Sequence, residues 1–159
     1  MKRIALLAML FVSALGYSQG SSNATATSNA IIVSPLKVVK VNDLNFGKII
    51  GSAAGGNVSI AADAGGARTI DSDMDAPTSD NQAASFEITG GDETYTITLE
   101  ATDLTATNET DMVLTPETSL SGTTSSGTQT IYVGGTLAVN PNQGAATYEG
   151  DVKVTVSYE

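Results

Sequence analysis

The residue types that most often carry chemistry are scarce in this sequence. It has no histidine and no cysteine, which excludes a Ser–His–Asp arrangement, a thiol nucleophile and most zinc or copper sites. Two facing carboxylates can still hydrolyse glycosides. Sugar sites usually need aromatic platforms, however, and the chain has five tyrosines, three phenylalanines and no tryptophan. We therefore expect no enzyme and no cofactor, and keep a carboxylate-only hydrolase as the least supported alternative.

One acidic cluster has the ligand type and spacing for Ca²⁺. Residues 71–75 run Asp-Ser-Asp-Met-Asp, which places alternate carboxylates on one side of an extended loop. The segment is similar to the start of an EF-hand loop, but Ala76 stands where the turn glycine belongs, and Gln82 where the bidentate glutamate belongs. We interpret the segment as a solvated acidic loop. The alternative is a Ca²⁺ site, whose candidate ligands are Asp71, Asp73 and Asp75.

The N-terminus has the parts of an export signal. Lys2 and Arg3 precede an apolar run over residues 4–15, and small residues precede a cut after Ser18. The run is shorter than the roughly 20 apolar residues that span a bilayer. We predict a signal peptide over residues 1–18 and export to the periplasm, the outer surface or the medium, without membrane insertion of the mature chain.

The mature chain is strongly acidic. Cleavage after Ser18 removes two basic residues and leaves five basic against 17 acidic side chains, a net charge of −12. Such a surface repels nucleic acid and anionic lipid. Without cysteine there are no disulfides, so stability must come from the core alone.

The order of residues favours strands throughout. Thr, Gly, Ala, Ser and Val dominate, and no apolar pattern of period 3.6 is present in the mature chain. We predict an extended or flexible leader over residues 19–29, then one domain over residues 30–159. This domain is an antiparallel β-sandwich of the Ig-like or pilin-like kind, with about 8–10 short strands.

Several strands are expected from period-two alternation. The first is expected at residues 31–33, and further apolar segments follow at residues 36–41 and 44–50. Residues 84–89 and 94–100 alternate on either side of Gly90-Gly91-Asp92, which predicts a β-hairpin. Residues 119–128 are expected to be a loop, and residues 152–158 form a nearly ideal half-buried strand. The predicted core contains Phe46, Phe86, Ile88, Tyr95, Ile97, Leu99, Ile131, Val133, Leu137, Val152, Val154 and Val156.

A family resemblance covers nearly the whole mature chain. The segments that carry it, in order, are Asp-Leu-Asn-Phe-Gly-Lys-Ile at 43–49, Ala-Ser-Phe-Glu-Ile-Thr-Gly at 84–90, Val-Gly-Gly-Thr-Leu-Ala-Val at 133–139 and the closing strand that follows Tyr148-Glu149-Gly150. This order resembles the DUF4402 family of exported bacterial proteins. The resemblance implies a fold and a compartment, but no activity.

A second resemblance bears on assembly. An alternating final strand with an aromatic residue one position from the C-terminus is similar to pilin subunits of chaperone–usher systems and to spore-coat-U-like proteins. In those families a strand from a neighbour completes the sandwich, and the leader is often the donor. Here one face of such a strand would carry Ala24, Ala26, Ser28, Ala30 and Ile32, which are mostly smaller than the residues of pilin donors.

Two functions from different classes remain open at this point. The first is a non-catalytic exported structural or adhesive surface protein, such as a pilus-like subunit, whose partners are itself or other surface subunits joined by strand addition. The alternative is a monomeric secreted binding module for a small ligand, a polysaccharide or Ca²⁺. A structural subunit should leave a sheet edge unpaired, whereas a binding module should have a concave site.

Overall fold

The computed structural model describes residues 20–78, 80–91, 93–120, 122–124 and 127–159. The predicted signal peptide, Gln19 and Asp92 lie outside these residues. The described part is all-β, as predicted, and contains no helix long and apolar enough to cross a membrane. Its strands are β1 Lys37–Asn42, β2 Gly56–Ile60, β3 Arg68–Ile70, β4 Ala84–Thr89, β5 Tyr95–Ala101, β6 Val113–Thr118, β7 Gly122–Thr124, β8 Gln129–Val139 and β9 Val152–Tyr158.

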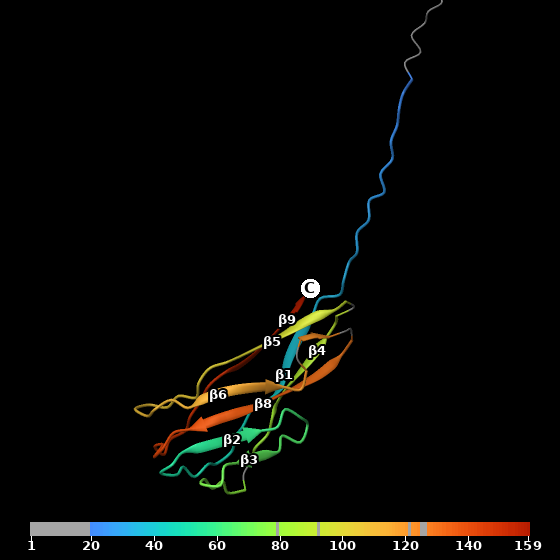
Figure 1. Ribbon diagram of the computed structural model, residues 1–159. Coiled ribbons are helices and arrows are strands. Elements are labelled where there is room, and N and C mark those ends of the chain that lie inside the picture. Colours follow the sequence, from blue (N-terminus) through green and yellow to red (C-terminus); the bar gives the residue numbers. More distant parts are fainter. Residues whose placement is uncertain (1–19, 79, 92, 121, 125–126) are drawn as a thin grey trace, which may run out of the picture. The chain divides into compact units, whose positions relative to one another are not determined.

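The strands form two antiparallel sheets (Figure 1). The larger sheet has the order β1-β4-β8-β2-β3, and β6 also pairs with β8. The smaller sheet has the order β7-β5-β9. One core cluster takes buried side chains from β4 and β8 of the first sheet and from β5 of the second, so the two sheets pack face to face as a sandwich.

The long strand β8 organises the larger sheet because it changes partner along its length. Residues up to Val133 pair with β4, and residues from Gly135 onward pair with β2. Gly134 lies at the change, and a side chain there would collide with the carbonyl oxygen of Ile60. Gly134 is thus a point of close backbone approach within one continuous strand.

The predicted hairpin is wrong, although both of its strands exist. β4 pairs with β1 and β8, whereas β5 pairs with β7 and β9 in the other sheet. Gly90 and Gly91 both have positive φ, 85° and 79°, and they carry the chain from one sheet to the other. Ile88 and Tyr95 are both fully buried in the same cluster, so the two strands face each other across the core instead of lying side by side.

Other expected elements also differ from the structure. Residues 31–33 form no strand, and Ile31 and Ile32 are 85% and 95% exposed. Residues 44–50 make only isolated bridges, at Asn45 and Ile50, where positive φ at Gly47 interrupts the extended backbone. The expected loop 119–128 contains the short strand β7, which pairs with β5.

The core is larger than the predicted set. Of the predicted residues, Leu99 and the three valines of β9 are only partly buried, and the others are buried. A second cluster packs beside the first, around β2 and the C-terminal half of β8. Its buried residues that were not predicted are Val58, Ile60, Met74, Ala83, Met112, Leu114 and Val139.

Truncation of Phe86 tests the core between the sheets. Its side chain is 7% exposed within the cluster that joins β4, β5 and β8. We expect Phe86→Ala to lower the free energy of unfolding by about 3–5 kcal/mol, because it removes transfer energy and leaves a cavity. Val113→Ala on β6, where the side chain is 53% exposed, should change it by less than ~1 kcal/mol. Urea titration measures both, and equal effects would contradict the core assignment.

Tyr95 carries a buried hydroxyl with no hydrogen-bond partner among the described residues. Burial raises the pKa of Tyr95 above its ordinary value of 10.0. We expect Tyr95→Phe to leave the free energy of unfolding unchanged or to raise it by up to ~1 kcal/mol at neutral pH, because no hydrogen bond is lost.

The pH dependence follows from the same shift. Above pH 10.0 the unfolded chain releases the Tyr95 proton before the folded chain does, so the stability that this group contributes at lower pH is lost as pH rises. Tyr95→Phe should therefore lose less stability than wild type between neutral pH and pH ~11 in urea titrations. A variant that is less stable than wild type at neutral pH would show that the hydroxyl has a partner.

Candidate functional site

The sandwich is open along one side, between β1 and β9. Each is the terminal strand of its sheet, and among the described residues neither has a partner on its outer edge. An unpaired edge presents a row of N–H and C=O groups that can pair with another strand. We call this region the seam and define it as Lys37–Asn42 together with Val152–Tyr158.

The core beneath the seam is incompletely covered. In β9 the side chains of Val152, Val154 and Val156 are only partly buried, and they pack against the cluster between the sheets. Val38 of β1 has the same partial burial. The equivalent inward residues of the inner strands β4 and β8 are fully buried. Apolar surface is therefore available along the seam for a further strand.

The seam is closed at one end and open at the other. At the closed end the hydroxyl of Tyr158 donates a hydrogen bond to the carbonyl of Ser34, just before β1. At the open end a groove of about 730 Å³ lies between the end of β1 and the start of β9. Charged and polar groups rim this groove, among them Lys40, Asn42, Asp43, Asp103, Glu149 and Asp151.

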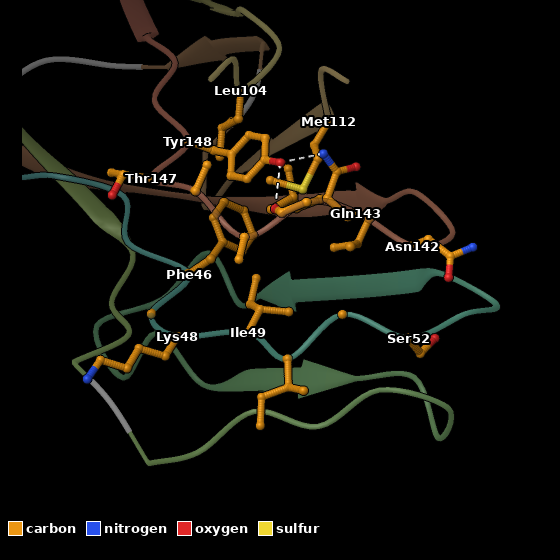
Figure 2. Close-up of a pocket in the computed structure, with 18 of the residues that line it drawn as sticks. Phe46, Lys48, Ile49, Ser52, Leu104, Met112, Asn142, Gln143, Thr147 and Tyr148 are labelled. Atoms are coloured by element: carbon orange, nitrogen blue, oxygen red, sulfur yellow. Dashed lines mark hydrogen bonds between the residues drawn. The ribbon is translucent and has the colours of Figure 1, made fainter. Parts of the chain in front are cut away.

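A second hollow of about 1050 Å³ continues from this groove (Figure 2). The two share Leu44, Phe46, Leu104 and Tyr148 as lining residues. Figure 2 shows the side chains of Phe46, Leu104 and Met112 gathered around the phenol ring of Tyr148. The described residues that line this hollow include no carboxylate and one cation, Lys48, so binding here would depend on apolar contact, neutral polar groups and the ammonium group of Lys48.

A hydrogen-bond network fixes the wall of this hollow. The side-chain amide of Gln143 donates to the hydroxyl of Tyr148 at 2.7 Å and to the carbonyl of Thr110 at 2.6 Å. The Tyr148 hydroxyl donates to the Gly144 carbonyl at 2.8 Å. The side-chain amide of Asn140 donates to Gln143 Oε1 at 2.7 Å. These groups bind one another, and the network holds the Tyr148 ring in place.

Arg68 supports the same hollow from β3. Its Nη1 donates to the carbonyls of Phe46 and Lys48 at 2.8 and 3.1 Å, and its Nη2 donates to those of Ala76 and Pro77 at 3.2 and 2.8 Å. The planar guanidinium therefore ties two loops together. The sequence analysis missed this residue, although Arg68 is the only arginine outside the predicted signal peptide.

The predicted metal ligands lie in an exposed loop. The Asp71 carboxylate accepts hydrogen bonds from the backbone N–H and side-chain amide of Asn57, at 2.8 and 3.2 Å. The Asp75 carboxylate accepts one from the backbone of Ala76 at 2.8 Å, and Asp73 is exposed. Within the described ranges no three acidic, histidine or cysteine side chains are grouped as a metal site. Calcium binding here stays a prediction from sequence.

The leader is described from Gly20 onward. Residues 20–31 form no strand, and every one of them is exposed. The predicted donor face of Ala24, Ala26, Ser28, Ala30 and Ile32 is therefore unpaired in the structure.

Comparison with known proteins identified one family. A family model described as "Domain of unknown function (DUF4402)" matches residues 36–158, from just before β1 to the end of β9. The searches of curated proteins and of solved structures found no match. The resemblance to the DUF4402 family is confirmed, whereas the resemblance to pilin subunits stays a prediction from sequence. The matched residues include both strands of the seam.

The contribution of Arg68 can be tested by a conservative change. We expect Arg68→Lys to lower the free energy of unfolding by about 1–3 kcal/mol, because an ammonium group cannot span four carbonyls in the plane of a guanidinium. Lys153→Ala serves as the control, since it removes only an exposed ion pair with Glu100 and should cost less than ~1 kcal/mol. Chemical denaturation measures both, and equal losses would contradict the assigned role.

Proposed function

The chain belongs to the DUF4402 family, a domain of unknown function, and we propose from its geometry that it is an exported, non-catalytic structural subunit of the cell surface. The observation that carries the proposal is the seam, where two unpaired strand edges flank partly exposed apolar side chains. A strand from another subunit would gain main-chain hydrogen bonds and cover this apolar surface at the same time.

The charge pattern around the seam supports a role in controlled pairing. Lys37 and Lys40 lie on β1 and Lys153 lies on β9, so three of the five basic residues of the mature chain are on these two strands. Lysine on an edge strand is a common protection against uncontrolled association. A chain that is otherwise acidic thus places three of its five basic residues on strands whose outer edges are open to pairing.

Export and lack of catalysis are part of the same proposal. The predicted signal over residues 1–18 directs the chain out of the cytoplasm, to the periplasm, the outer surface or the medium. A chain without histidine or cysteine is better suited to assembly than to acid–base or thiol chemistry. An adhesive or pilus-like subunit meets these conditions without a cofactor.

The second hollow favours a different candidate function, a secreted binding module. Its 1050 Å³ would hold a small molecule or a short stretch of polysaccharide, and the Gln143–Tyr148 network shapes its wall before any ligand arrives. The described residues that line it offer the rings of Phe46 and Tyr148 and the amides of Asn142 and Gln143. This reading requires no contact between subunits.

Electrophoresis separates the two functions. We expect the mature chain, Gln19–Glu159, to run in non-denaturing detergent as a ladder of subunit multiples that collapses to one band on boiling, because strand addition is dissociated only by unfolding. Val154→Asp should abolish the ladder, because it places a charge against the apolar floor of the seam. Val113→Asp, on the exposed outer face of β6, should retain it.

The outcomes are distinct provided that the variants fold, which circular dichroism checks. Val154→Thr conserves the shape of the side chain, and is the second variant if Val154→Asp unfolds. A single band at the subunit mass for unboiled wild-type protein would overturn the assembly proposal and favour the binding module.

A further inference from the structure

Tyr148 lies where the two hollows meet. It lines both the groove at the open end of the seam and the larger hollow beside it, and its side chain is only partly buried. Its hydroxyl accepts a hydrogen bond from the side chain of Gln143 and donates one to the carbonyl of Gly144. The orientation of the phenol is therefore fixed, and the surface that it leaves open to a ligand is mainly the carbon surface of the ring.

Much of the remaining apolar lining is already covered by the protein itself. Four apolar residues that line the larger hollow are buried in the core, namely Phe46, Met112, Leu137 and Val139. The open apolar surface comes from separate side chains, such as Leu104, which is partly buried beside the ring (Figure 2), and the exposed Ile50. A wholly apolar ligand such as a lipid chain would gain little contact here, because its affinity depends on the apolar area that it covers.

Neutral polar groups flank the ring. Figure 2 shows Thr147 on one side of Tyr148 and Asn142 on the other, and both of these flanking residues are exposed. The backbone of Asn142 is held by a hydrogen bond from its N–H to the carbonyl of Ser52 at 2.9 Å. A hydroxyl and a carboxamide donate and accept hydrogen bonds without carrying charge. These groups suit the hydroxyls of a sugar, while the Tyr148 ring suits the C–H face of the same sugar.

The charges around the site disfavour an anionic ligand. The described residues that line the groove include one lysine and four carboxylates, Lys40 against Asp43, Asp103, Glu149 and Asp151. Lys40 already pairs with Asp43 at 2.5 Å. The cation of the larger hollow, Lys48, is exposed, and Figure 2 shows its side chain pointing away from Tyr148. A polyanion would meet repulsion along the groove, whereas a neutral polymer would not.

We infer that the groove and the larger hollow together bind a neutral polysaccharide, with a sugar ring packed on Tyr148 and sugar hydroxyls bonded to Asn142 and Thr147. The inference rests on the second candidate function, the secreted binding module, and names the class of its ligand. The hollows share lining residues, so one polymer can extend through both. Pockets of about 300–1,000 Å³ hold ligands of drug size, and a short stretch of linked sugars has this size.

Affinity electrophoresis tests the ligand class and the position of the site. The mature chain runs in native gels that contain a neutral polymer (dextran, mannan, xylan or hydroxyethyl cellulose) or the polyanion polygalacturonate. We expect at least one neutral polymer to retard the chain, and polygalacturonate to leave its mobility unchanged. Tyr148→Ala should weaken the retardation at least ~10-fold, because it removes the ring. Tyr132→Ala should weaken it less than ~3-fold, because Tyr132 is also partly buried against the same cluster but lines neither hollow.

A second pair of variants keeps the inference testable if Tyr148→Ala unfolds, which circular dichroism checks. Asn142 has a φ of 56°, a value that glycine adopts readily, so Asn142→Gly removes the amide without strain. We expect it to weaken the retardation at least ~5-fold, through the lost hydrogen bonds. Asn108→Gly is the matched control, because Asn108 has a φ of 62° and lines neither hollow, and it should change the retardation less than ~2-fold. Retardation of the wild-type chain should also change less than ~2-fold between about 50 and 500 mM NaCl, because a neutral polymer forms no ion pair.

The outcomes separate this inference from the functions proposed above. If only polygalacturonate retards the chain and Tyr148→Ala abolishes that effect, the site binds another class of ligand and only the inference fails. If none of the polymers retards the chain, the binding module fails with it, whereas the ladder in gels without polymer still tests assembly. Equal weakening by Tyr148→Ala and Tyr132→Ala, or by Asn142→Gly and Asn108→Gly, would contradict the site. Retardation should persist in Val154→Asp, since Val154 lines neither hollow, and its loss there would show that assembly caused it.

Discussion

The crossing at Gly90-Gly91 is the constraint on which the architecture depends. Positive φ at two successive residues is readily available only to glycine, and it sends β4 and β5 into different sheets. Had they paired, one continuous sheet would have left the apolar faces of both strands without a cover. Because they separate, Ile88 and Tyr95 meet across the core, β9 pairs with β5, and β1 pairs with β4. The open seam between β1 and β9 is a direct result of this crossing.

Packing of apolar side chains holds the two sheets together. Two clusters of buried residues supply this packing, and the chain has no cysteine with which to form a disulfide. Close backbone approach at Gly134 lets β8 pair with β4 along its first half and with β2 along its second half. Arg68 adds to the isolated bridges at Asn45 and Ile50 in joining the same two loops, through carbonyl groups that would otherwise need water.

Period-two patterns predicted which residues face inward but not which strands pair. The alternation at 84–89, 94–100 and 152–158 located β4, β5 and β9 and most of the core, because burial of one face leaves a local signal. Pairing is decided by contacts between distant segments, so the hairpin was predicted wrongly. Met74 was missed because it lies within the acidic segment 71–75, although its own side chain is buried. The Arg68 clamp and the Gln143–Tyr148 network leave no period in the sequence, and the seam becomes visible only when both sheet orders are known.

The partial burial along β9 connects stability to assembly. The inner strands β4 and β8 bury their inward residues, whereas Val152, Val154 and Val156 of β9 keep part of their surface in water. That surface weakens the isolated domain, because each square ångström left exposed contributes nothing to folding. Any segment that covers the seam binds the folded state alone and so adds to its stability by mass action. Under the proposed assembly function, an added strand would supply that cover, because its main-chain groups would pair with the open edge while its side chains pack beside the valines.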